Sequence, residues 1–420
     1  MKIAVIGSGI AGLASAWFCQ RAGHAVTVLE ADERWGGHIH THAVPERGRT
    51  LPIDSGFIVC NDRTYPQFLA LCRHLGAPLR PTTMSFSVQD EATGLEWQGS
   101  SLNGLFAQRR NLLRPAFVGM ALDILRFNKA IPRLLHGAEG EVPLGQWCRA
   151  QGLGQAFIEH YLVPFGGAIW SSPPQVMLEF PARFFARFVH NHGMDTVDGR
   201  PQWFTVVGGS RAYAERLRAL LPEVRTGSPV QRVGRVDGGV AVVTPQGEER
   251  FDQVILACHA DDALGLIADA TPAERAVLGC FPYQDNTAVL HTDATLMPRR
   301  RRAWAAWNAH CPATPQDRVA VTYDMTCLQG LPEDQARYFV TLNHTGRIAP
   351  ERVVRAMTYR HPLFTTASPG AQARHGEING VRGLRFAGAY WRFGFHEDGL
   401  VSAQQAVAGL ADPVIPEAVA

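Results

Sequence analysis

The first residues of the chain alternate between short apolar runs and a glycine-rich turn. Residues 2–6 (KIAVI) and 25–29 (AVTVL) are apolar and largely β-branched, residues 7–12 contain three glycines, and residues 13–22 have the spacing of a helix. Apolar runs of this kind, bounded by turn residues, are typical of buried strands. The pattern therefore predicts a strand, a helix and a second strand within about 30 residues, the unit that builds a parallel sheet.

The rest of the chain predicts a second part that contains both helices and strands. Residues 68–75 and 112–135 have helical spacing, and the longer of these helices interleaves apolar positions with Arg and Lys. We predict a surface helix of a second domain there, and a helix that lies on a membrane surface is the alternative. Alternating runs predict a strand meander and one buried strand over 224–257, more strands over 286–344, and a final strand and helix over 384–410.

Composition narrows the class of protein. A chain of 420 residues that is 46% hydrophobic and 19% charged is globular, with two or three domains expected. The 40 basic and 38 acidic residues leave a net charge of +2, so no nucleic-acid partner is expected. The eight cysteines form no C-x-x-C pair, which argues against a zinc site or a disulfide framework and favours a reducing, cytoplasmic location.

The apolar segments are too short to cross a membrane. No uninterrupted apolar stretch reaches the ~18 residues that a spanning helix needs. Glycines interrupt the apolar opening of the chain, which we therefore interpret as mature sequence and not as a signal peptide. Peripheral contact with the inner membrane surface stays open.

The glycines of the first turn form a dinucleotide-binding motif. Gly7, Gly9 and Gly12, with Ile10 and Ala11 between them, follow a predicted strand and open a predicted helix. In this motif the glycines allow a tight turn, the approach of a pyrophosphate and close packing of helix on strand. Glu30, followed by Ala31, ends the second strand, where a carboxylate can accept the ribose hydroxyls of an adenosine.

A second glycine pair distinguishes FAD from NAD. Arg34, Gly36, Gly37 and His38 follow the second strand and allow another backbone approach to the pyrophosphate. The sequence here resembles the FAD-dependent oxidoreductases of the amine oxidase and phytoene desaturase superfamily, in which an R-x-G-G element follows the dinucleotide fingerprint. The resemblance implies non-covalent FAD, with His38 at a position where relatives carry Arg.

The resemblance extends along the chain. Val230 with residues 255–257 is similar to the strands that flank the adenine in that superfamily, and residues 386–399, which include Gly388, Phe395, His396 and Glu397, are similar to its C-terminal flavin motif. More narrowly, the chain resembles a bacterial subgroup labelled predicted NAD/FAD-binding protein, through the segments 53–59, 191–193, 207–210 and 394–399. Members of that subgroup are associated with enzymes that modify unsaturated fatty acyl chains, which suggests a lipid substrate.

These observations predict an α/β fold with two domains. We expect a glutathione-reductase-type FAD-binding Rossmann domain, assembled from residues 1–60, 200–262 and 375–412. Residues 61–199 and 263–374 then form an α+β substrate-binding domain.

The expected activity is hydride transfer at flavin N5. We expect an enzyme that introduces or reduces unsaturation in a hydrophobic, acyl-lipid substrate. No second glycine fingerprint provides an NAD(P)H domain, so electrons come from the substrate or from a separate electron partner. Amine oxidases of the superfamily commonly use a lysine near flavin N5, and no lysine follows Lys129 here. Amine oxidation with release of hydrogen peroxide and double-bond isomerisation remain the alternatives.

Candidate catalytic residues are histidines, whose pKa lies near neutrality. His396 and His192 are the candidates for a catalytic base, with structural roles as the alternative for both. His38, His40 and His42 alternate, but without nearby carboxylates they do not predict a metal site.

Two further features have both a functional and an ordinary interpretation. The aromatic residues between 157 and 188 form either a substrate tunnel or a packed core. The basic run 299–302 suits anionic lipid head groups, a phosphopantetheine carrier or simply solvent.

Overall fold

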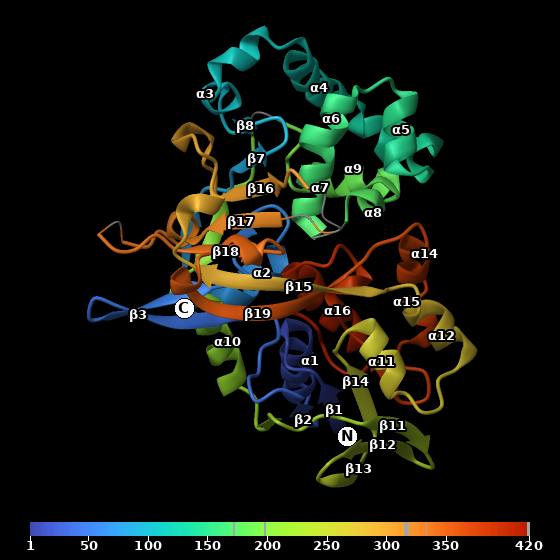
Figure 1. Cartoon of the computed structure of the whole chain (residues 1–420). Helices are drawn as coiled ribbons and strands as arrows, with labels where there is room; N and C mark the ends of the chain where they lie inside the picture. The colour runs from blue at the N-terminus through green and yellow to red at the C-terminus, as the bar shows by residue number, and fades with distance from the viewer. Residues whose placement is uncertain (171–172, 197–198, 315–317, 319, 333, 418–420) are drawn as a thin grey trace.

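The computed structural model stacks three levels of structure, with the helices α3 to α9 at one end, a large mixed sheet in the middle and a parallel sheet at the other end (Figure 1). It describes residues 1–170, 173–196, 199–314, 318, 320–332 and 334–417. Among these, no helix is long and apolar enough to cross a membrane.

The parallel sheet has five strands in the order β10, β2, β1, β14 and β20, and each neighbouring pair is parallel. The strands are β1 (Lys2–Ile6), β2 (Ala25–Leu29), β10 (Val224–Arg225), β14 (Gln253–Leu256) and β20 (Leu384–Phe386). The predicted strands at 2–6 and 25–29 are confirmed without a shift. Both faces of such a sheet are covered, which explains the continuous apolar runs.

Alternate strand residues enter two different cores. Val5, Val28 and Ile255 face α1 (Ile10–Arg21), α10 (Ser210–Ala219) and α16 (His396–Ala406). The next residues along the strands, such as Ile6 and Leu256, face the opposite core, where α11 (Ala260–Leu266) and α12 (Pro272–Leu278) lie. This division follows from the two-residue period of a strand.

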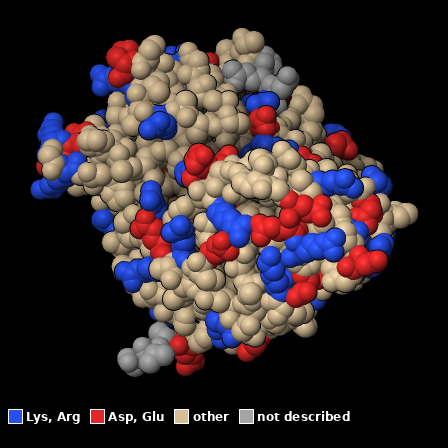
Figure 2. All heavy atoms as spheres, turned by 90° about the horizontal axis from the view of Figure 1, so that it is seen from below, with Lys and Arg blue, Asp and Glu red and all other residues tan. Residues whose placement is uncertain are grey.

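An antiparallel meander follows in the chain, as the alternating pattern predicted. It consists of β11 (Arg232–Val236), β12 (Gly239–Thr244) and β13 (Gly247–Phe251), and the buried β14 comes directly after it. Lys, Arg, Asp and Glu side chains are intermixed over the face of the molecule seen from this end (Figure 2).

The middle level is a seven-stranded sheet in the order β19, β15, β18, β17, β16, β7 and β8, in which only the pair β16 and β7 is parallel among the described strands. Its strands are β7 (Phe86–Asp90), β8 (Leu95–Gln98), β15 (Tyr283–His291), β16 (Trp307–Cys311), β17 (Ala320–Asp324), β18 (Phe339–Leu342) and β19 (Val353–Pro362). Sequence patterning missed β19. This edge strand is exposed over most of its first half, so it lacks the apolar alternation that marks a half-buried strand.

Smaller sheets connect the two large ones. They are the hairpin of β3 (Thr41–Glu46) and β4 (Arg49–Asp54) and a sheet of β5 (Cys60–Asn61), β9 (Trp203–Val206) and β6 (Leu79–Thr82). The hairpin extends to one side of the molecule (Figure 1).

The helical level buries a core rich in aromatic side chains. Its helices are α3 (Leu102–Leu105), α4 (Pro115–His136), α5 (Leu144–Ala150), α6 (Gln155–Phe157), α7 (Val163–Trp170), α8 (Pro174–Leu178) and α9 (Ala182–Asn191). The helix predicted over 112–135 is α4. The remaining α-helices are α2 (Pro66–His74), α13 (Met325–Gln329), α14 (Ser368–Ala373) and α15 (His375–Ile378). Short helical turns are η1 (Arg109–Leu113), η2 (Ala138–Glu141), the π-type η3 (Ile158–Leu162), η4 (Ala294–Leu296), η5 (Arg301–Ala303), η6 (Thr345–Arg347), η7 (Pro350–Arg352) and η8 (Ala389–Trp391).

The predicted fold class is confirmed: an α/β part with a parallel Rossmann-type sheet and a second α+β part. All five strands of the parallel sheet lie in residues 1–60, 200–262 and 375–412, and all seven strands of the mixed sheet lie in residues 61–199 and 263–374. The domain boundaries themselves stay a prediction.

Candidate cofactor site and active site

The turn between β1 and α1 is built around its glycines. Gly7 has φ 103°, and a Cβ atom there would lie 2.7 Å from the carbonyl oxygen of Ala257. A Cβ on Gly12 would lie 1.9 Å from the carbonyl oxygen of Gly7. A Cβ on Gly9, in contrast, would meet nothing within 4 Å. Two of the three glycines are therefore needed to close the turn, whereas Gly9 faces open space.

The N-terminus of α1 is free to bind an anion. Its N-cap residue is Gly9, and no side chain caps the first turn, which begins with Ile10 and Ala11. Unpaired backbone N–H groups and the helix dipole favour negative charge at such an end. The structure thus presents the donors that a pyrophosphate needs.

Glu30 connects the two glycine turns. Its carboxylate accepts hydrogen bonds from the backbone N–H of Ser8 (3.0 Å) and from Asp32 N–H (3.1 Å). The Ser8 hydroxyl also donates to Glu30 and itself accepts a hydrogen bond from Gly36 N–H (2.8 Å). Ala31 is exposed directly after Glu30. The carboxylate stands at the end of β2 as predicted, and its contact with a ribose stays a prediction.

The second glycine turn packs on the first. Gly36 and Gly37 have φ of 108° and 56°, and a Cβ on Gly37 would lie 3.4 Å from the Cα of Gly9. Arg34 stabilises this turn, because its guanidinium donates to the carbonyl oxygens of Gly37 (2.8 Å) and Ile39 (3.2 Å). A side chain at Gly37 would enter the cradle between the turns, whereas one at Gly36 would meet the carbonyl oxygen of Ile39 (3.0 Å). The two backbone segments therefore fit a pyrophosphate held from both sides.

The C-terminal motif packs against this cradle. A Cβ on Gly399, in α16, would lie 2.8 Å from Ile10 Cγ2, so the two helices are in close contact at their N-terminal ends. Asp398 accepts hydrogen bonds from the N–H groups of Phe393 (3.1 Å) and Phe395 (2.9 Å), which fixes the loop before α16. Gly388 follows β20 and donates its N–H to Ser402 (2.8 Å).

The side chain of Glu397 stabilises the fold. The carboxylate accepts from the N–H groups of Gln67 (3.0 Å) and Phe68 (2.8 Å) in the first turn of α2. Burial raises the pKa of Glu397 to about 7. Val230, predicted to flank the adenine, is partly buried and packs against the core that includes β14.

His396 is buried against three aromatic rings. Its ring stacks on Phe57 with centroids 3.8 Å apart, lies edge-on to Phe68, and bonds through Nε2 to the Tyr213 hydroxyl. Burial lowers the pKa of His396 to about 3, so the ring is neutral. This geometry favours the structural alternative for the side chain of His396.

His192 has the geometry of a base. Its Nδ1 donates to the carbonyl oxygen of Phe188 (2.9 Å), which leaves the lone pair on Nε2. The ring stacks on Phe188 and lies 5.9 Å from the ring of Phe395, in the C-terminal motif. Burial lowers the pKa of His192 to about 4, which keeps the imidazole neutral. The catalytic role of His192 stays a prediction.

The edge strand β19 adds residues that sequence reasoning missed. Tyr359 and His361 lie on one face of β19, and the ring of His38 lies 5.0 Å from Tyr359 and 5.2 Å from His361. Asn286 donates to Nδ1 of His361 (3.1 Å), so Nε2 of His361 carries the proton. Nε2 of His38 is buried and has no hydrogen-bond partner among the described residues. This orphaned atom beside the glycine cradle is a further sign that a ligand belongs there.

A chain of hydrogen bonds runs behind His38. The hydroxyl of Tyr359 bonds to His40 Nδ1 (2.8 Å) and to Ser55 Oγ (2.6 Å), and Ser55 bonds to His42 Nε2 (2.7 Å). Burial lowers the pKa of His40 to about 3 and that of His42 to about 4. Hydrogen bonds to Tyr359 and Ser55 therefore hold the rings of His40 and His42 in place.

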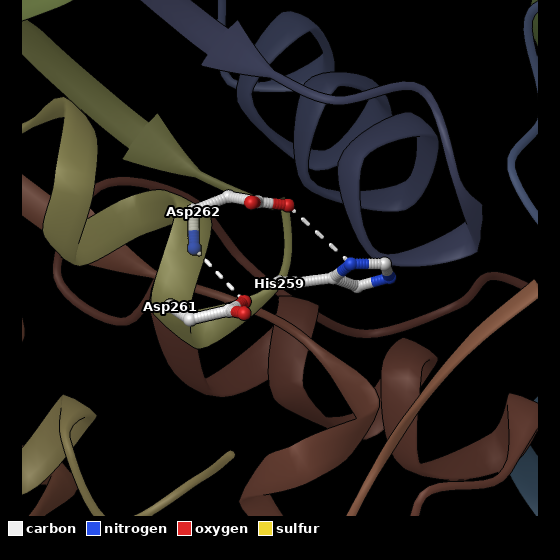
Figure 3. A group of neighbouring side chains, drawn as sticks. All are labelled: His259, Asp261 and Asp262. Atoms are coloured by element: carbon white, nitrogen blue, oxygen red, sulfur yellow. Dashed lines mark hydrogen bonds and ion pairs between the residues drawn. The ribbon is translucent and has the colours of Figure 1, made fainter. Parts of the chain in front are cut away.

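One group among the described residues has ligand atoms close enough to hold a metal: His259, Asp261 and Asp262, at the start of α11 (Figure 3). His259 Nδ1 lies 3.4 Å from the carboxylate of Asp262. Arg360, on β19, forms ion pairs with both aspartates. These contacts lower the pKa of Asp262 to about 2. The carboxylates already have a counter-ion, so the group needs no metal and instead joins β19 to the parallel sheet.

Comparison with known families identifies the fold around this cradle. Residues 10–291 match the model of the flavin containing amine oxidoreductase family. The chain belongs to this family. The predicted superfamily is confirmed, and so is FAD, whose non-covalent binding is typical of these flavin containing amine oxidoreductases.

Individual relatives are distant. AofH of Mycobacterium tuberculosis, proposed to be a flavin-containing monoamine oxidase, is 27% identical over 276 residues, which are 61% of this chain and 56% of AofH. The chain thus spans about half the length of this curated relative.

Solved structures support the fold over nearly the whole chain. A CLA-producing fatty acid isomerase from P. acnes superposes with a TM-score of 0.71 at 17% identity, over 97% of this chain and 98% of that one. Cyclohexylamine oxidase from Brevibacterium oxydans IH-35A superposes with a TM-score of 0.69 at 16% identity, with the same coverage. At these identities the likeness concerns the amine oxidoreductase fold.

Proposed function

We propose that this chain is an FAD-dependent oxidoreductase that desaturates or saturates a carbon–carbon bond in a fatty acyl substrate. Bound FAD supplies a two-electron acceptor or donor for such chemistry. The glycine turns and the N-terminus of α1 would hold its pyrophosphate. The chain's other residues would exclude water and orient the acyl chain.

The observation that carries the proposal is the apolar wall around the C-terminal flavin motif. Phe393 and Phe395 pack against Phe184 and Phe188 of α9, with ring centroids 5.1 to 6.1 Å apart. Trp170 donates its indole N–H to the carbonyl oxygen of Phe393 (3.2 Å). An apolar, water-poor surface suits hydride removal from a weakly activated carbon.

The aromatic residues divide between core and wall. The side chains of Phe157, Phe180 and Phe185 are fully buried in the helical core, so the structure places them in the packed core and not in an open tunnel. Phe184 and Phe188 lie where this core meets the C-terminal motif. The proposed acyl contact surface is therefore the edge of the aromatic cluster.

The histidines near this wall are uncharged. Burial lowers the pKa of His192 and of His361 to about 4, and that of His38 well below its usual range. Neither lysine is part of this wall, since Lys2 pairs with Glu249 beside β1 and Lys129 is exposed on α4. Neutral histidines and apolar rings at this wall support an acyl substrate.

Amine oxidation is the second candidate. The family match and the name of AofH favour it, because both refer to amine oxidation. In that case hydrogen peroxide and an aldehyde would be released, and an imidazole would replace the missing lysine. In the saturating direction of the acyl-lipid proposal a separate partner must supply electrons to FAD, and in the desaturating direction an electron acceptor must reoxidise the reduced FAD.

Anaerobic mixing separates these reactions. The FAD-loaded protein is mixed with unsaturated or methyl-branched phospholipids, with free fatty acids and with simple amines, and the oxidised-flavin absorbance is followed. In the desaturating direction we expect lipids or fatty acids to bleach oxidised FAD, in the saturating direction we expect unsaturated ones to reoxidise reduced FAD, and we expect amines to do neither. Bleaching by amines with peroxide release on admission of oxygen would refute the acyl proposal, and double-bond migration without bleaching would replace it with isomerisation.

A further inference from the structure

Exposed apolar side chains are concentrated in one segment of the helical level. Six of the thirteen exposed large hydrophobic side chains in the described part of the chain lie between residues 102 and 125. We call them the leucine face, and they are Leu102 (76% exposed), Leu112 (53%), Leu113 (88%), Val118 (37%), Leu122 (57%) and Leu125 (56%). Large apolar side chains gathered on one surface indicate a contact with another apolar phase or molecule.

The helix α4 is apolar on two sides. Phe117, Met120 and Phe127 point into the aromatic core and are at most 4% exposed. Val118, Leu122 and Leu125 have the spacing of a second stripe, which faces solvent. The inner stripe explains the stability of the helix, and the outer stripe is left largely exposed.

Positive charge accompanies the leucine face along the chain. No Asp or Glu occurs between Glu96 and Asp123, whereas Arg109, Arg110 and Arg114 do. None of these three arginines has an ion pair among the described residues. Asp123 itself is buried, and it accepts hydrogen bonds from Arg126 (2.6 Å) and from Gly154 N–H (2.8 Å).

The basic run of the sequence lies next to this face. The turn η5, which contains Arg301 and Arg302, packs against α3 and β8. Glu96, on β8, accepts hydrogen bonds from the backbone N–H groups of Arg299 (2.9 Å) and Arg300 (3.1 Å) and thereby fixes the run in place. All four arginine side chains are exposed. Two segments far apart in the sequence therefore contribute charge to one surface.

The same helix also contains a basic pocket. A cavity of about 400 Å³ is lined by Arg126, Lys129, Ala130, Arg133, Trp147, Gln151 and Leu153. Lys129 has no carboxylate partner among the described residues. Along α4, the exposed leucines are thus followed by a pocket lined with cationic side chains.

We propose that the leucine face and the arginines around it dock this protein on a bilayer that contains anionic phospholipid. Leucines beside Arg and Lys are the combination that interfacial helices use, with apolar side chains in the acyl region and cations at the headgroups. A second copy of the chain would bring the same positive charge to the contact, which disfavours a dimer through this face. Docking on a membrane is a property separate from the proposed reaction, and vesicle binding can be measured without enzyme turnover.

Vesicle binding of the full-length, FAD-loaded protein tests the proposal. The probes are vesicles of phosphatidylcholine alone and vesicles with about 30% phosphatidylglycerol. We expect co-sedimentation with the anionic vesicles, and its loss in high salt because headgroup attraction is screened. Equal binding to both vesicles, or to neither, would overturn the proposal.

Paired variants locate the contact. Leu112→Ser with Leu113→Ser should weaken binding at least about tenfold, since both side chains would enter the acyl boundary. The matched control is Val353→Ser with Val354→Ser, which alters two adjacent exposed side chains of β19 (41% and 40% exposed) and should leave binding unchanged. Equal losses in the two double variants would refute the assignment of the face.

Charge variants test the basic run. Arg299→Gln with Arg302→Gln should reduce binding to anionic vesicles roughly 25-fold, at about fivefold for each cation near the surface. Arg232→Gln with Arg250→Gln makes the same charge change on the meander and should have little effect. Flavin content and circular dichroism verify folding of each variant.

Two further results would contradict docking on lipid. Sedimentation that shows a dimer dissociated by the Leu112 and Leu113 substitutions would assign the face to a second copy. Binding to an acidic protein in place of vesicles would assign it to a protein partner. Failure of vesicle binding leaves the acyl-lipid reaction testable with dispersed fatty acids, so the two proposals fail separately.

Discussion

Replacing Gly9 by alanine tests the binding of the pyrophosphate separately from the stability of the turn. Gly9 has φ −65° and ψ 179°, a conformation open to any residue, and its Cβ would meet nothing within 4 Å. The folded protein without FAD should therefore tolerate Gly9→Ala. A Gly→Ala change at a compatible position stabilises by about 0.4–1 kcal/mol, because the unfolded chain loses freedom.

The same methyl group should obstruct FAD. If the Cβ keeps a phosphate from one backbone N–H group, one charge-assisted hydrogen bond is lost, worth about 1.5–3 kcal/mol. At about 1.4 kcal/mol per factor of ten, the Kd for FAD should rise between roughly 10-fold and 100-fold.

Gly7→Ala and Gly12→Ala are the controls. At Gly7 the methyl group would lie 2.7 Å from a backbone oxygen at φ 103°, and at Gly12 it would lie 1.9 Å from another. Both should destabilise the protein without FAD, by at least the ~1–3 kcal/mol of a strained backbone site. They therefore lose FAD together with the fold, whereas Gly9→Ala loses only FAD.

The assay combines thermal unfolding of the FAD-free proteins with titration of FAD by fluorescence. The expected result for Gly9→Ala is an unchanged or raised Tm and a raised Kd. An unchanged Kd in a well-folded Gly9→Ala protein would refute the placement of the pyrophosphate between the two glycine turns.

Three further predictions concern the histidines and their partners. If Nε2 of His192 is the base, His192→Gln should lower turnover by about 10²–10⁴-fold with flavin retained. The control His136→Gln, at an exposed position, should not lower turnover. Equal rates for the two variants would show that His192 is not the catalytic base. Burial lowers the pKa of His396 to about 3, so the folded protein favours the neutral ring. The resulting contribution to stability is complete above the unfolded pKa of about 6.5 and is lost as the pH falls towards the folded value. Denaturant unfolding should accordingly show that lowering the pH from roughly 7.5 to roughly 5.5 costs the wild type about 1.4 kcal/mol more than His396→Phe, and parallel losses would contradict a neutral buried ring. Tyr359→Phe removes the hydroxyl shared by His40 and Ser55 and should cost about 1–3 kcal/mol in urea unfolding, whereas a negligible change would show that the buried chain is not stabilising.

The cofactor cradle was predictable because its chemistry is local. Gly7, Gly9 and Gly12 lie within one strand-to-helix turn, and Glu30 ends the next strand, so the order of residues nearly dictates their positions. The second glycine pair, Gly36 and Gly37, was predicted to approach the same pyrophosphate, and the structure does place Gly37 against Gly9. Spacing along the chain carries this information without any long-range contact.

The surroundings of the cradle could not be predicted in the same way. Tyr359 and His361 come from an edge strand whose exposed residues give no apolar period, and only sheet pairing brings them over His38. The partners of His396 were likewise not predictable, because Phe57 and Tyr213 are separated from it by more than 180 residues.

By itself, the sequence determined the parallel sheet, the dinucleotide turn and the amphipathic character of α4, since these depend on short-range periodicity and on the conformations open to glycine. Only the tertiary structure decided which histidines are enclosed by aromatic rings, which aromatic side chains form the core, and which leucines of α4 are left outside it. Burial is a property of all segments packed together. The pKa of a histidine and the exposure of a leucine therefore follow from contacts that no local pattern encodes.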